Sequence, residues 1–284
     1  MERIIVESPA KINLCLRILG RRKDGYHNIF SIMQVIDLMD VIEIEKSKTF
    51  SIQVDGAIIE GENIILKAWK ILSNAMSKDL GVNVKLYKRI PIGAGLGGGS
   101  SDAAAFLSAI NRLYELGLDT KFMMKLASEV GSDVPFFLST GSAMVTGRGE
   151  IVESIQLPLD YYILLIVPNY SISTARAYSL IKNILTSIDD INNIKNCLSN
   201  DFYKVLREFK NDFEPVIGAE HPELIESLSL LREYGAENSL LSGSGSAFFG
   251  IFRDAVDAMK ASMHGWDGTV YLVRPIANRF DFSM

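Results

Sequence analysis

The feature that most constrains the fold of this chain is a glycine-rich stretch at residues 91–104, which reads PIGAGLGGGSSDAA. Five glycines fall between Gly93 and Gly99. Glycine loses more backbone freedom on folding than any other residue. A run of this kind therefore indicates either unusual backbone dihedrals or the close approach of another group to the main chain, and the flanking residues help to distinguish the two.

Regular patterns flank the glycines on both sides. Residues 82–90, VNVKLYKRI, alternate between apolar and polar positions, which predicts a strand. After the glycines, Ser100 and Ser101 are residue types that cap helices, and apolar residues recur at helical spacing through residues 106–113. Between a strand and the start of a helix, free backbone N–H groups and the helix dipole favour an anion. The stretch therefore predicts a phosphate-binding loop.

Other glycine motifs fit less well. The Walker pattern requires a lysine directly after the glycines, and none is present. The dinucleotide pattern is formally met by Gly93, Gly95 and Gly98, but it requires a second strand ending in an acid about twenty residues on. Residues 116–130 instead have the pattern of a helix. A purely structural turn stays open, although five glycines and two serines exceed what a turn needs.

The stretch resembles the phosphate loop of the galactokinase, homoserine kinase, mevalonate kinase and phosphomevalonate kinase (GHMP) superfamily. Residues 8–34 and 240–252 resemble two further conserved blocks of that superfamily, in the expected order. The first block contains SPAKINL and DGYH, as in the branch that phosphorylates the 2-hydroxyl of 4-diphosphocytidyl-2-C-methyl-D-erythritol for isoprenoid precursors. The cofactors implied are ATP and Mg²⁺, and the partner is this cytidyl diphosphate substrate.

The resemblance also implies the fold. It is an α+β fold of two lobes, with an N-terminal lobe like ribosomal protein S5 at residues 1–158 and a ferredoxin-like lobe at residues 159–284. The active site would lie in the cleft between them. Two alternatives remain: a superfamily kinase acting on another small alcohol such as homoserine or mevalonate, and an inactive sensor that binds ATP without turnover.

Two residues are candidates for catalysis. From the residues alone, Lys11 is a solvated strand end, and Asp133 is a turn former or helix cap. The resemblance implies otherwise, because Lys11 in PAKINL occupies the position of the catalytic lysine and Asp133 in GSDVPFF that of the catalytic base. Lysine beside a carboxylate keeps the acid ionised and offsets charge that develops during phosphoryl transfer.

The same resemblance implies two sets of binding residues. Tyr26 and Tyr178 would sandwich the cytosine of the substrate, and His27 would bond to its edge; Asn13 and Thr174 would contact the diphosphate or the polyol. From helical spacing alone, Tyr178 faces the core. The residues implied for the nucleotide are Pro91, Gly93, Ala94, Gly95, Leu96, Gly97, Gly98, Gly99, Ser100 and Ser101 of the loop, with Asn63 and Lys88 beside the adenine.

Three expectations concern the loops of this site. A second glycine-rich turn at residues 242–250 would close against the phosphates. Asp102 would compete with phosphate for N–H groups, so we expect it to point away or to order water on Mg²⁺, for which one of the paired serines is the candidate ligand. We also expect Gly97→Val to weaken ATP binding while leaving the fold largely intact.

Composition excludes several classes of protein. The net charge is −5 and the basic residues are scattered, which predicts no nucleic-acid partner. The longest apolar run, residues 161–167, is too short to cross a bilayer. Cys15 and Cys197 suggest neither a disulfide framework nor a zinc site, and the three separated histidines predict no metal site. We expect a cytoplasmic enzyme that is a monomer or a weak homodimer.

The remaining patterns predict a strand-rich first half and a mixed second half. Alternation indicates strands over the first 54 residues, and the predicted elements that follow are helices at residues 63–76 and 120–131, a hairpin around Gly147 and Gly149, a buried strand at 161–168, helical stretches over 174–234, a hairpin at 238–252, and a final helix and strand.

Overall fold

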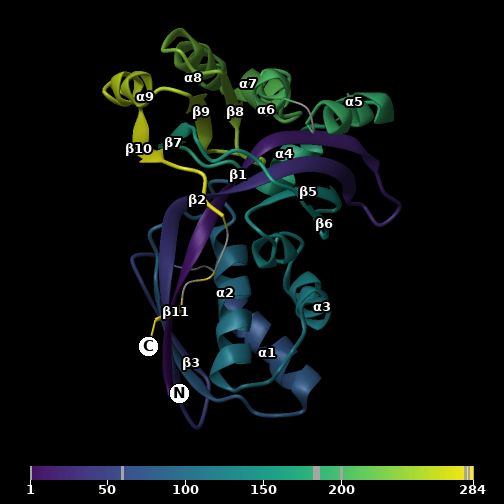
Figure 1. Ribbon diagram of the computed structural model, residues 1–284, viewed down its shortest axis with the longest axis vertical. Helices are drawn as coiled ribbons and strands as arrows, with labels where there is room; N and C mark the ends of the chain where they lie inside the picture. The colour runs from purple at the N-terminus through teal and green to yellow at the C-terminus, as the bar shows by residue number, and fades with distance from the viewer. Residues whose placement is uncertain are drawn as a thin grey trace.

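Two β-sheets organise the chain, whose computed structural model describes residues 2–58, 61–181, 186–198, 201–277, 280 and 282–283 (Figure 1). In the first sheet the strand order is β11-β1-β2-β4-β3, with β5 paired to the far part of β2 and β6 to β5. Its strands are β1 (Arg3–Arg21), β2 (His27–Lys46), β3 (Ser51–Asp55), β4 (Val82–Tyr87), β5 (Ser142–Gly147), β6 (Ile151–Ser154) and β11 (Phe282–Ser283).

The two longest strands, β1 and β2, pair along their whole length, from Arg3 opposite Glu45 to Arg21 opposite His27. The sequence pattern suggested several shorter strands here. The structure merges them, and the breaks in alternation become shifts of register, one of which lies between Asn13 and Cys15. Such bulges bend a strand, and Figure 1 shows both strands curving from the first sheet toward the upper part of the molecule.

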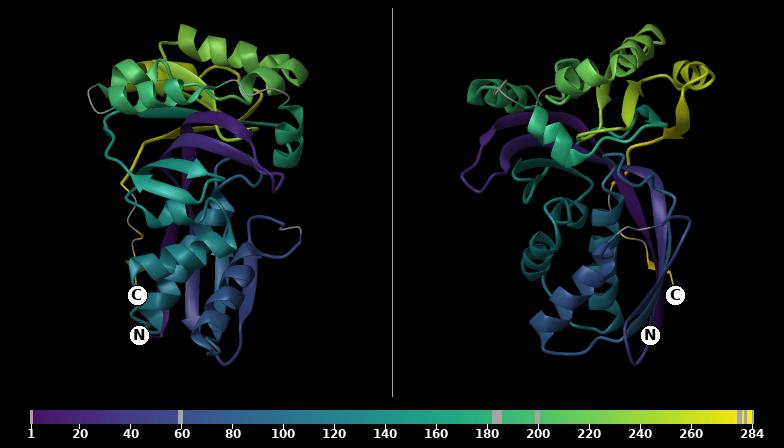
Figure 2. Two further views of the ribbon diagram at one scale, coloured as in Figure 1. Left: turned by 90° about the vertical axis from the view of Figure 1, so that its right-hand side faces the viewer. Right: turned by 180° about the vertical axis from the view of Figure 1, so that it is seen from behind.

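Three helices cover one face of the first sheet (Figures 1 and 2). They are α1 (Ile64–Met76), α2 (Gly98–Leu113) and α3 (Thr120–Val130). Asn63 caps α1 through a bond from the Ile65 N–H to its Oδ1 at 2.8 Å. The expected serine cap of α2 is wrong, because the N-cap is Gly97 and the Ser101 N–H already donates to the Gly97 carbonyl at 2.9 Å.

The second sheet has the strand order β10-β7-β9-β8, and all its neighbours are antiparallel. Helices join β7 to β8, and α9 joins β9 to β10, so the strands follow the split β-α-β-β-α-β pattern of ferredoxin-like folds. The elements are β7 (Tyr162–Pro168), α4 (Thr174–Leu180), α5 (Ile188–Leu198), α6 (Phe202–Leu206), α7 (Glu214–Glu220), α8 (Pro222–Glu233), β8 (Asn238–Leu241), β9 (Phe248–Phe252), α9 (Ala255–Ser262) and β10 (Gly268–Val273).

A shared hydrophobic core joins the two sheets. One buried cluster contains Ile12 and Ile32 from the long strands together with Ile163 and Phe249 from the second sheet. The division of the chain into two lobes at residue 158 stays a prediction. The short strand β11, near the C-terminus, pairs with β1 of the first sheet rather than with the second sheet. None of the described helices is long and apolar enough to span a membrane.

Cys15 is the cysteine whose side chain the structure describes. Cys15 is buried and carries a free thiol whose pKa is raised to about 12, chiefly by burial. The side chain of Cys197 lies outside the described residues.

Leu72 tests how much the α1 layer contributes to stability. Its side chain is buried in the cluster beneath the helices, so we expect Leu72→Ala to lower the free energy of unfolding by about 2–5 kcal/mol. Urea denaturation followed by circular dichroism measures this. The exposed Lys70→Ala on the same helix serves as the control and should stay within about 0.5 kcal/mol; an equal effect of both changes would contradict the packing described here.

Candidate active site

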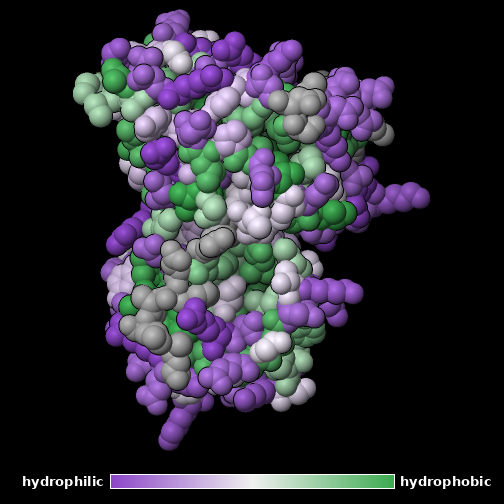
Figure 3. All heavy atoms as spheres, in the orientation of Figure 1, coloured by the Kyte–Doolittle hydropathy of each residue, from purple (hydrophilic) through white to green (hydrophobic). Residues whose placement is uncertain are grey.

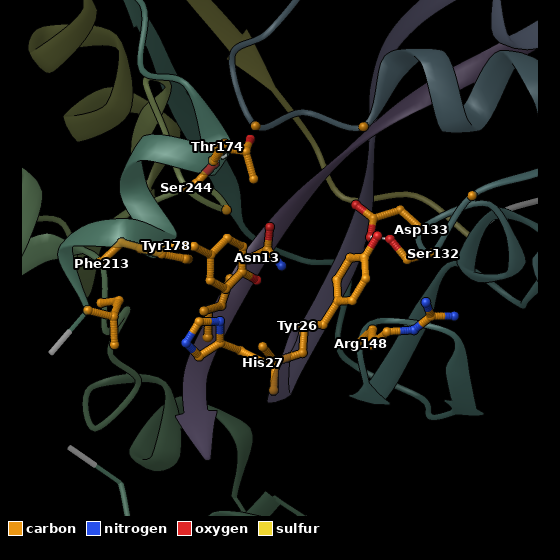
Figure 4. A pocket seen from close by; sticks show the side chains of 18 of the residues that line it. Asn13, Tyr26, His27, Ser132, Asp133, Arg148, Thr174, Tyr178, Phe213 and Ser244 are labelled. Atoms are coloured by element: carbon orange, nitrogen blue, oxygen red, sulfur yellow. Dashed lines mark hydrogen bonds between the residues drawn. The ribbon is translucent and has the colours of Figure 1, made fainter. Parts of the chain in front are cut away.

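A pocket of about 900 Å³ lies where the glycine-rich loop, β1, α4 and the turn between β8 and β9 come together (Figure 4). Its lining includes every residue that the sequence suggested for catalysis or for the substrate. Figure 4 shows their side chains arriving from both sides of one space. These residues are Lys11, Asn13, Tyr26, His27, Asp133, Thr174 and Tyr178, with Gly95, Gly97 and Ser100 from the loop.

The two glycine-rich turns interlock at one side of this pocket. The Ala247 N–H donates to the Ala94 carbonyl at 3.1 Å, and the Ser242 hydroxyl donates to the Gly95 carbonyl at 3.1 Å. Gly95 has φ +80°, and a Cβ on it would lie 2.1 Å from the Ser242 carbonyl oxygen. Only glycine fits this close approach of two main chains.

Lys11 is fixed against the same loop. Its Nζ donates to the Gly95 carbonyl at 2.7 Å and to Asn13 Oδ1 at 2.5 Å, and only 3% of the residue is exposed. Burial lowers the pKa of Lys11, and the Asp133 carboxylate opposes that shift. The lysine is therefore a buried ammonium held between the loop and the pocket, rather than a solvated strand end.

Asn13 has its amide orientation set by a chain of hydrogen bonds. Its Nδ2 donates to the Ser31 hydroxyl at 2.8 Å, and that hydroxyl donates to the Cys15 carbonyl at 2.7 Å. This leaves the amide oxygen to face Lys11. Lys11 and Asn13 are two residues apart on β1, so they share one face of the strand, and both line the pocket just before the bulge.

Asp133 reaches the pocket from a short connection after α3. The helix ends at Val130, and η1 (Pro135–Leu138) begins two residues after Asp133. Ser132 makes only a long contact to its carboxylate, at 3.5 Å. Figure 4 shows Asp133 on the side of the pocket opposite Tyr178, with the Tyr26 hydroxyl directed toward it. A carboxylate with so few hydrogen-bond partners among the described residues is available to accept a proton from a ligand.

The aromatic side chains are arranged differently from the expected sandwich of Tyr26 and Tyr178. The ring of His27 stacks on Tyr178, with centroids 5.0 Å apart and an angle of 19° between the planes. The ring of Phe213 lies nearly perpendicular to that of Tyr178, with centroids 4.9 Å apart. Tyr26 is 58% exposed and lies beneath the Arg148 guanidinium, 5.1 Å from its ring. In this conformation His27 covers one face of the Tyr178 ring.

Burial also changes the titration of this aromatic pair. It raises the pKa of Tyr178 to about 12, with a smaller contribution from Asp133. It lowers the pKa of His27, and Arg21 acts in the same direction. His27 therefore favours the neutral form, in which the ring offers one hydrogen-bond donor and one acceptor.

Asn63 and Lys88, the two residues expected beside the adenine, have different surroundings in the structure. Asn63 Nδ2 is buried and has no hydrogen-bond partner within the described part of the chain. The Lys88 ammonium lies in ion pairs with Asp40 and Asp102, so a contact of Lys88 with adenine could involve only its backbone or its alkyl stem. The Asp102 carboxylate pairs with Lys88 and accepts the Ser8 hydroxyl, and the expectation that it points away from phosphate or orders water on Mg²⁺ stays a prediction.

The expectation for Gly97→Val needs correction. Gly97 has φ +70°, and a Cβ on it would lie 3.0 Å from both the Lys11 stem and the Phe137 ring. Valine there would strain the backbone and push against the stem of Lys11. The variant would therefore alter the fold of the site itself, and its ATP affinity would not report on steric blocking of phosphate alone.

Two family models, both of GHMP kinases, match this chain. Residues 63–141 match the GHMP kinases N terminal domain, and residues 191–265 match the GHMP kinases C terminal domain. The 4-diphosphocytidyl-2-C-methyl-D-erythritol kinase of Thermodesulfovibrio yellowstonii is 42% identical over 258 residues, which are 89% of this chain and 90% of the relative. That of Prochlorococcus marinus strain MIT 9215 is 40% identical over 91% of this chain and 89% of the relative.

The chain belongs to the 4-diphosphocytidyl-2-C-methyl-D-erythritol kinase family. A crystal structure of 4-(cytidine 5′-diphospho)-2C-methyl-D-erythritol kinase superposes with a TM-score of 0.79 at 31% identity, covering 95% of this chain and 98% of that one. The homoserine kinase of Cytophaga hutchinsonii superposes with a TM-score of 0.78 at 18% identity, over 98% and 96% of the two chains. This second likeness shows the shared GHMP fold alone.

Sequence reasoning missed several pocket residues of this family member. Arg148 comes from the turn between β5 and β6, and Ser244 from the second glycine-rich turn, where its hydroxyl hydrogen-bonds Thr174 at 2.9 Å. Phe213 packs on Tyr178 from a segment that was predicted only as helical. The positions of Arg148 in a hairpin turn and of Ser244 in a glycine-rich turn were weak indications of a binding role. Nothing in the local sequence around Phe213 indicated one.

The interlocked turns give opposite expectations for two glycines of one loop. Gly95→Ala should lower the free energy of unfolding by about 1–3 kcal/mol or more, because its methyl group would collide with the Ser242 carbonyl. Gly99 lies in the first turn of α2, where a methyl group would meet nothing closer than Ile64 at 3.6 Å. Gly99→Ala should therefore be neutral or stabilising by up to about 1 kcal/mol. Urea denaturation of both variants tests this; equal stabilities would contradict the interlock.

Proposed function

We propose that this protein transfers the γ-phosphoryl group of ATP to the 2-hydroxyl of 4-diphosphocytidyl-2-C-methyl-D-erythritol. One observation carries the proposal beyond family membership: a buried lysine, an available carboxylate and a glycine-rich helix start face one pocket that also holds a stacked tyrosine and histidine. Relatives that are 34–42% identical over nearly the full chain favour this substrate over homoserine or mevalonate.

The start of α2 supports binding of the ATP phosphates. The first N–H groups of a helix have no partners within the helix, and together with the dipole they favour an anion. Gly98, Gly99 and Ser100 occupy these positions, and Ser100 lines the pocket. Asn63 Nδ2 and Ser101 Oγ are buried without partners among the described residues, which suits them to a polar ligand such as the nucleotide.

Mg²⁺ fits this site through oxygen ligands rather than through a cage of acids. Among the described residues no group of three His, Cys, Asp or Glu side chains could hold a metal ion. One of the hydroxyls of Ser100 and Ser101 would hold the ion together with phosphate oxygens, as Mg²⁺ commonly binds. When bound, it neutralises charge on the phosphates during transfer.

Asp133 would act as the base for the substrate hydroxyl. Its carboxylate would accept the proton as the oxygen attacks phosphorus, and it interacts electrostatically with the side chain of Lys11. The Nζ of Lys11 also lies close to the loop where the phosphates would lie, through its bond to the Gly95 carbonyl. Because both groups are preorganised by the protein, little rearrangement is required at the moment of transfer.

The other end of the pocket would hold the cytidine diphosphate. Tyr178 offers a ring face once a base displaces His27 from it, and His27 then borders the edge of the base. Thr174, Ser244 and Asn13 supply hydroxyl and amide groups for the diphosphate and the polyol. We further propose that the enzyme works in the cytoplasm as a monomer or weak homodimer, without a nucleic-acid partner.

Asp133→Asn should keep both substrates bound and lower kcat by about 10²–10⁴-fold, because it removes general base action. Lys11→Ala should lower kcat similarly, and the double variant should fall short of the product of the two losses if they act as one unit. Steady-state kinetics with ATP and the cytidyl substrate measure this. Ser132→Ala is the adjacent control and should leave kcat nearly unchanged, whereas fully multiplicative losses would contradict the pair.

Substrate choice separates this kinase from its relatives in the superfamily. Tyr178→Ala should raise the KM for the cytidyl substrate about ten- to a hundredfold, which corresponds to about 1–3 kcal/mol of stacking, with little change in the KM for ATP. Tyr170→Ala is a matched control, because Tyr170 stacks on His221 in the same way outside the pocket lining.

A uridyl analogue adds an independent test of the cytosine site. A site that hydrogen-bonds the edge of one base rejects an analogue that leaves its polar groups unpaired. We therefore expect a low kcat/KM for the uridyl analogue with the wild-type enzyme. Equal efficiency on both bases would contradict the cytosine site and leave the protein as a kinase of some other small alcohol.

A further inference from the structure

Three buried charged residues lie directly behind the glycine-rich loop, and the reaction described above does not use them. The Lys88 ammonium donates to one oxygen of Asp40 and, at 2.8 Å, to Asp102 Oδ2. The exposed fractions of the three side chains are 4% for Lys88, 0% for Asp40 and 2% for Asp102. We refer to Asp40, Lys88 and Asp102 as the buried charge cluster.

The cluster binds the chain just before the loop. The second oxygen of Asp40 accepts the backbone N–H groups of Arg89 at 2.5 Å and Ile90 at 2.8 Å. These are the last two residues before the loop begins at Pro91. Since Asp40 belongs to β2, one carboxylate attaches the entrance of the loop to the central part of the first sheet.

The cluster also binds the chain just after the loop. Asp102 lies near the start of α2, and its Oδ1 accepts the Ser8 hydroxyl of β1 at 2.6 Å. Lys88 lies so close to this helix start that a Cβ on Gly98 would be 3.3 Å from the ammonium nitrogen. Each end of the loop is therefore fixed to a neighbouring strand by a carboxylate, and one ammonium links the two carboxylates.

Such anchoring matters because the loop has few side chains with which to hold its own position. Five of its residues are glycine, and a backbone without side chains adopts many conformations when it is not constrained. The interlock with the second turn fixes only the middle of the loop, at Ala94 and Gly95. We propose that the buried charge cluster is a positioning device that sets the place of the loop and of the first N–H groups of α2 for the phosphates of ATP.

The charges of the cluster agree with this role. Burial alone would lower the pKa of Lys88, but the two carboxylates together raise it, so the ammonium persists. Burial raises the pKa of Asp102 to about 7, and Lys88 counteracts that shift. Buried ion pairs often stabilise a fold no more than apolar residues would, and their use fits a need for one defined geometry.

The experiment compares two substitutions of one residue. Asp102→Ala removes the bonds to Lys88 and Ser8, whereas the amide of Asp102→Asn can still accept from Lys88 and bond to Ser8. We expect Asp102→Ala to weaken binding of a non-hydrolysable ATP analogue about tenfold or more, since small displacements of a positioned group have large effects. The asparagine variant should recover most of that affinity, and the KM for the cytidyl substrate should change little in either. Isothermal titration calorimetry and steady-state kinetics measure these quantities.

Two further variants keep the test decisive. Leu72→Ala destabilises the same layer without touching the loop, and it should leave affinity for the ATP analogue unchanged. Ser8→Ala removes a single hydrogen bond to Asp102, so it should fold even if Asp102→Ala does not, and it should weaken ATP binding in the same direction to a smaller extent.

The outcomes are distinct. Unchanged affinity in folded Asp102→Ala or Ser8→Ala, an equal loss for both substrates, or no recovery with asparagine would overturn the positioning role. This inference rests on the proposed function, yet its failure is distinguishable. Wild-type protein that does not phosphorylate the cytidyl substrate would contradict the proposed function, whereas the comparison of ATP-analogue binding among variants would still decide the role of the cluster.

Discussion

The Gly95 carbonyl is the point at which the active site is assembled. It accepts the Lys11 ammonium at 2.7 Å and the Ser242 hydroxyl at 3.1 Å, so one backbone oxygen joins β1, the glycine-rich loop and the second turn. These segments lie far apart in the sequence. The pocket exists because the two turns approach each other this closely, and that approach requires glycine at position 95, where a Cβ would strike the Ser242 carbonyl.

The long strands make this meeting possible. β1 and β2 belong to the first sheet and also carry side chains into the core that they share with the second sheet. The register shift after Asn13 comes directly after Lys11 and Asn13, the two residues of this part of β1 that reach the pocket. Bulges are common beside active sites.

Charge is distributed in two layers around the loop. Lys11 lies on the pocket side, where its ammonium is accompanied by the Asp133 carboxylate and the site offers room for a ligand. Lys88 lies behind the loop, where two carboxylates enclose its ammonium and leave it 4% exposed. In the sequence, Lys11 precedes an apolar strand pattern and Lys88 follows one. Lys11 nevertheless lines the pocket, whereas Lys88 joins two buried carboxylates behind the loop.

The sequence by itself determined the elements that depend on local physics. Alternation predicted β4, helical spacing predicted α1 and α3, and the glycine-rich stretch between strand and helix predicted an anion site. The resemblance of short motifs then indicated the GHMP fold and the kinase family, which the comparisons confirmed. These features can be predicted from a single sequence because each depends on residues that are close neighbours along the chain.

Only the tertiary structure decided which side chains meet. It stacked His27 on Tyr178, placed Lys88 in a buried ion cluster, and brought Phe213 and Arg148 to the pocket. It also showed that Gly97 lies against Lys11 and cannot be enlarged without strain. Such contacts depend on the packing of separate segments of the chain, on the bends of β1 and on burial, and no local pattern in the sequence carries that information.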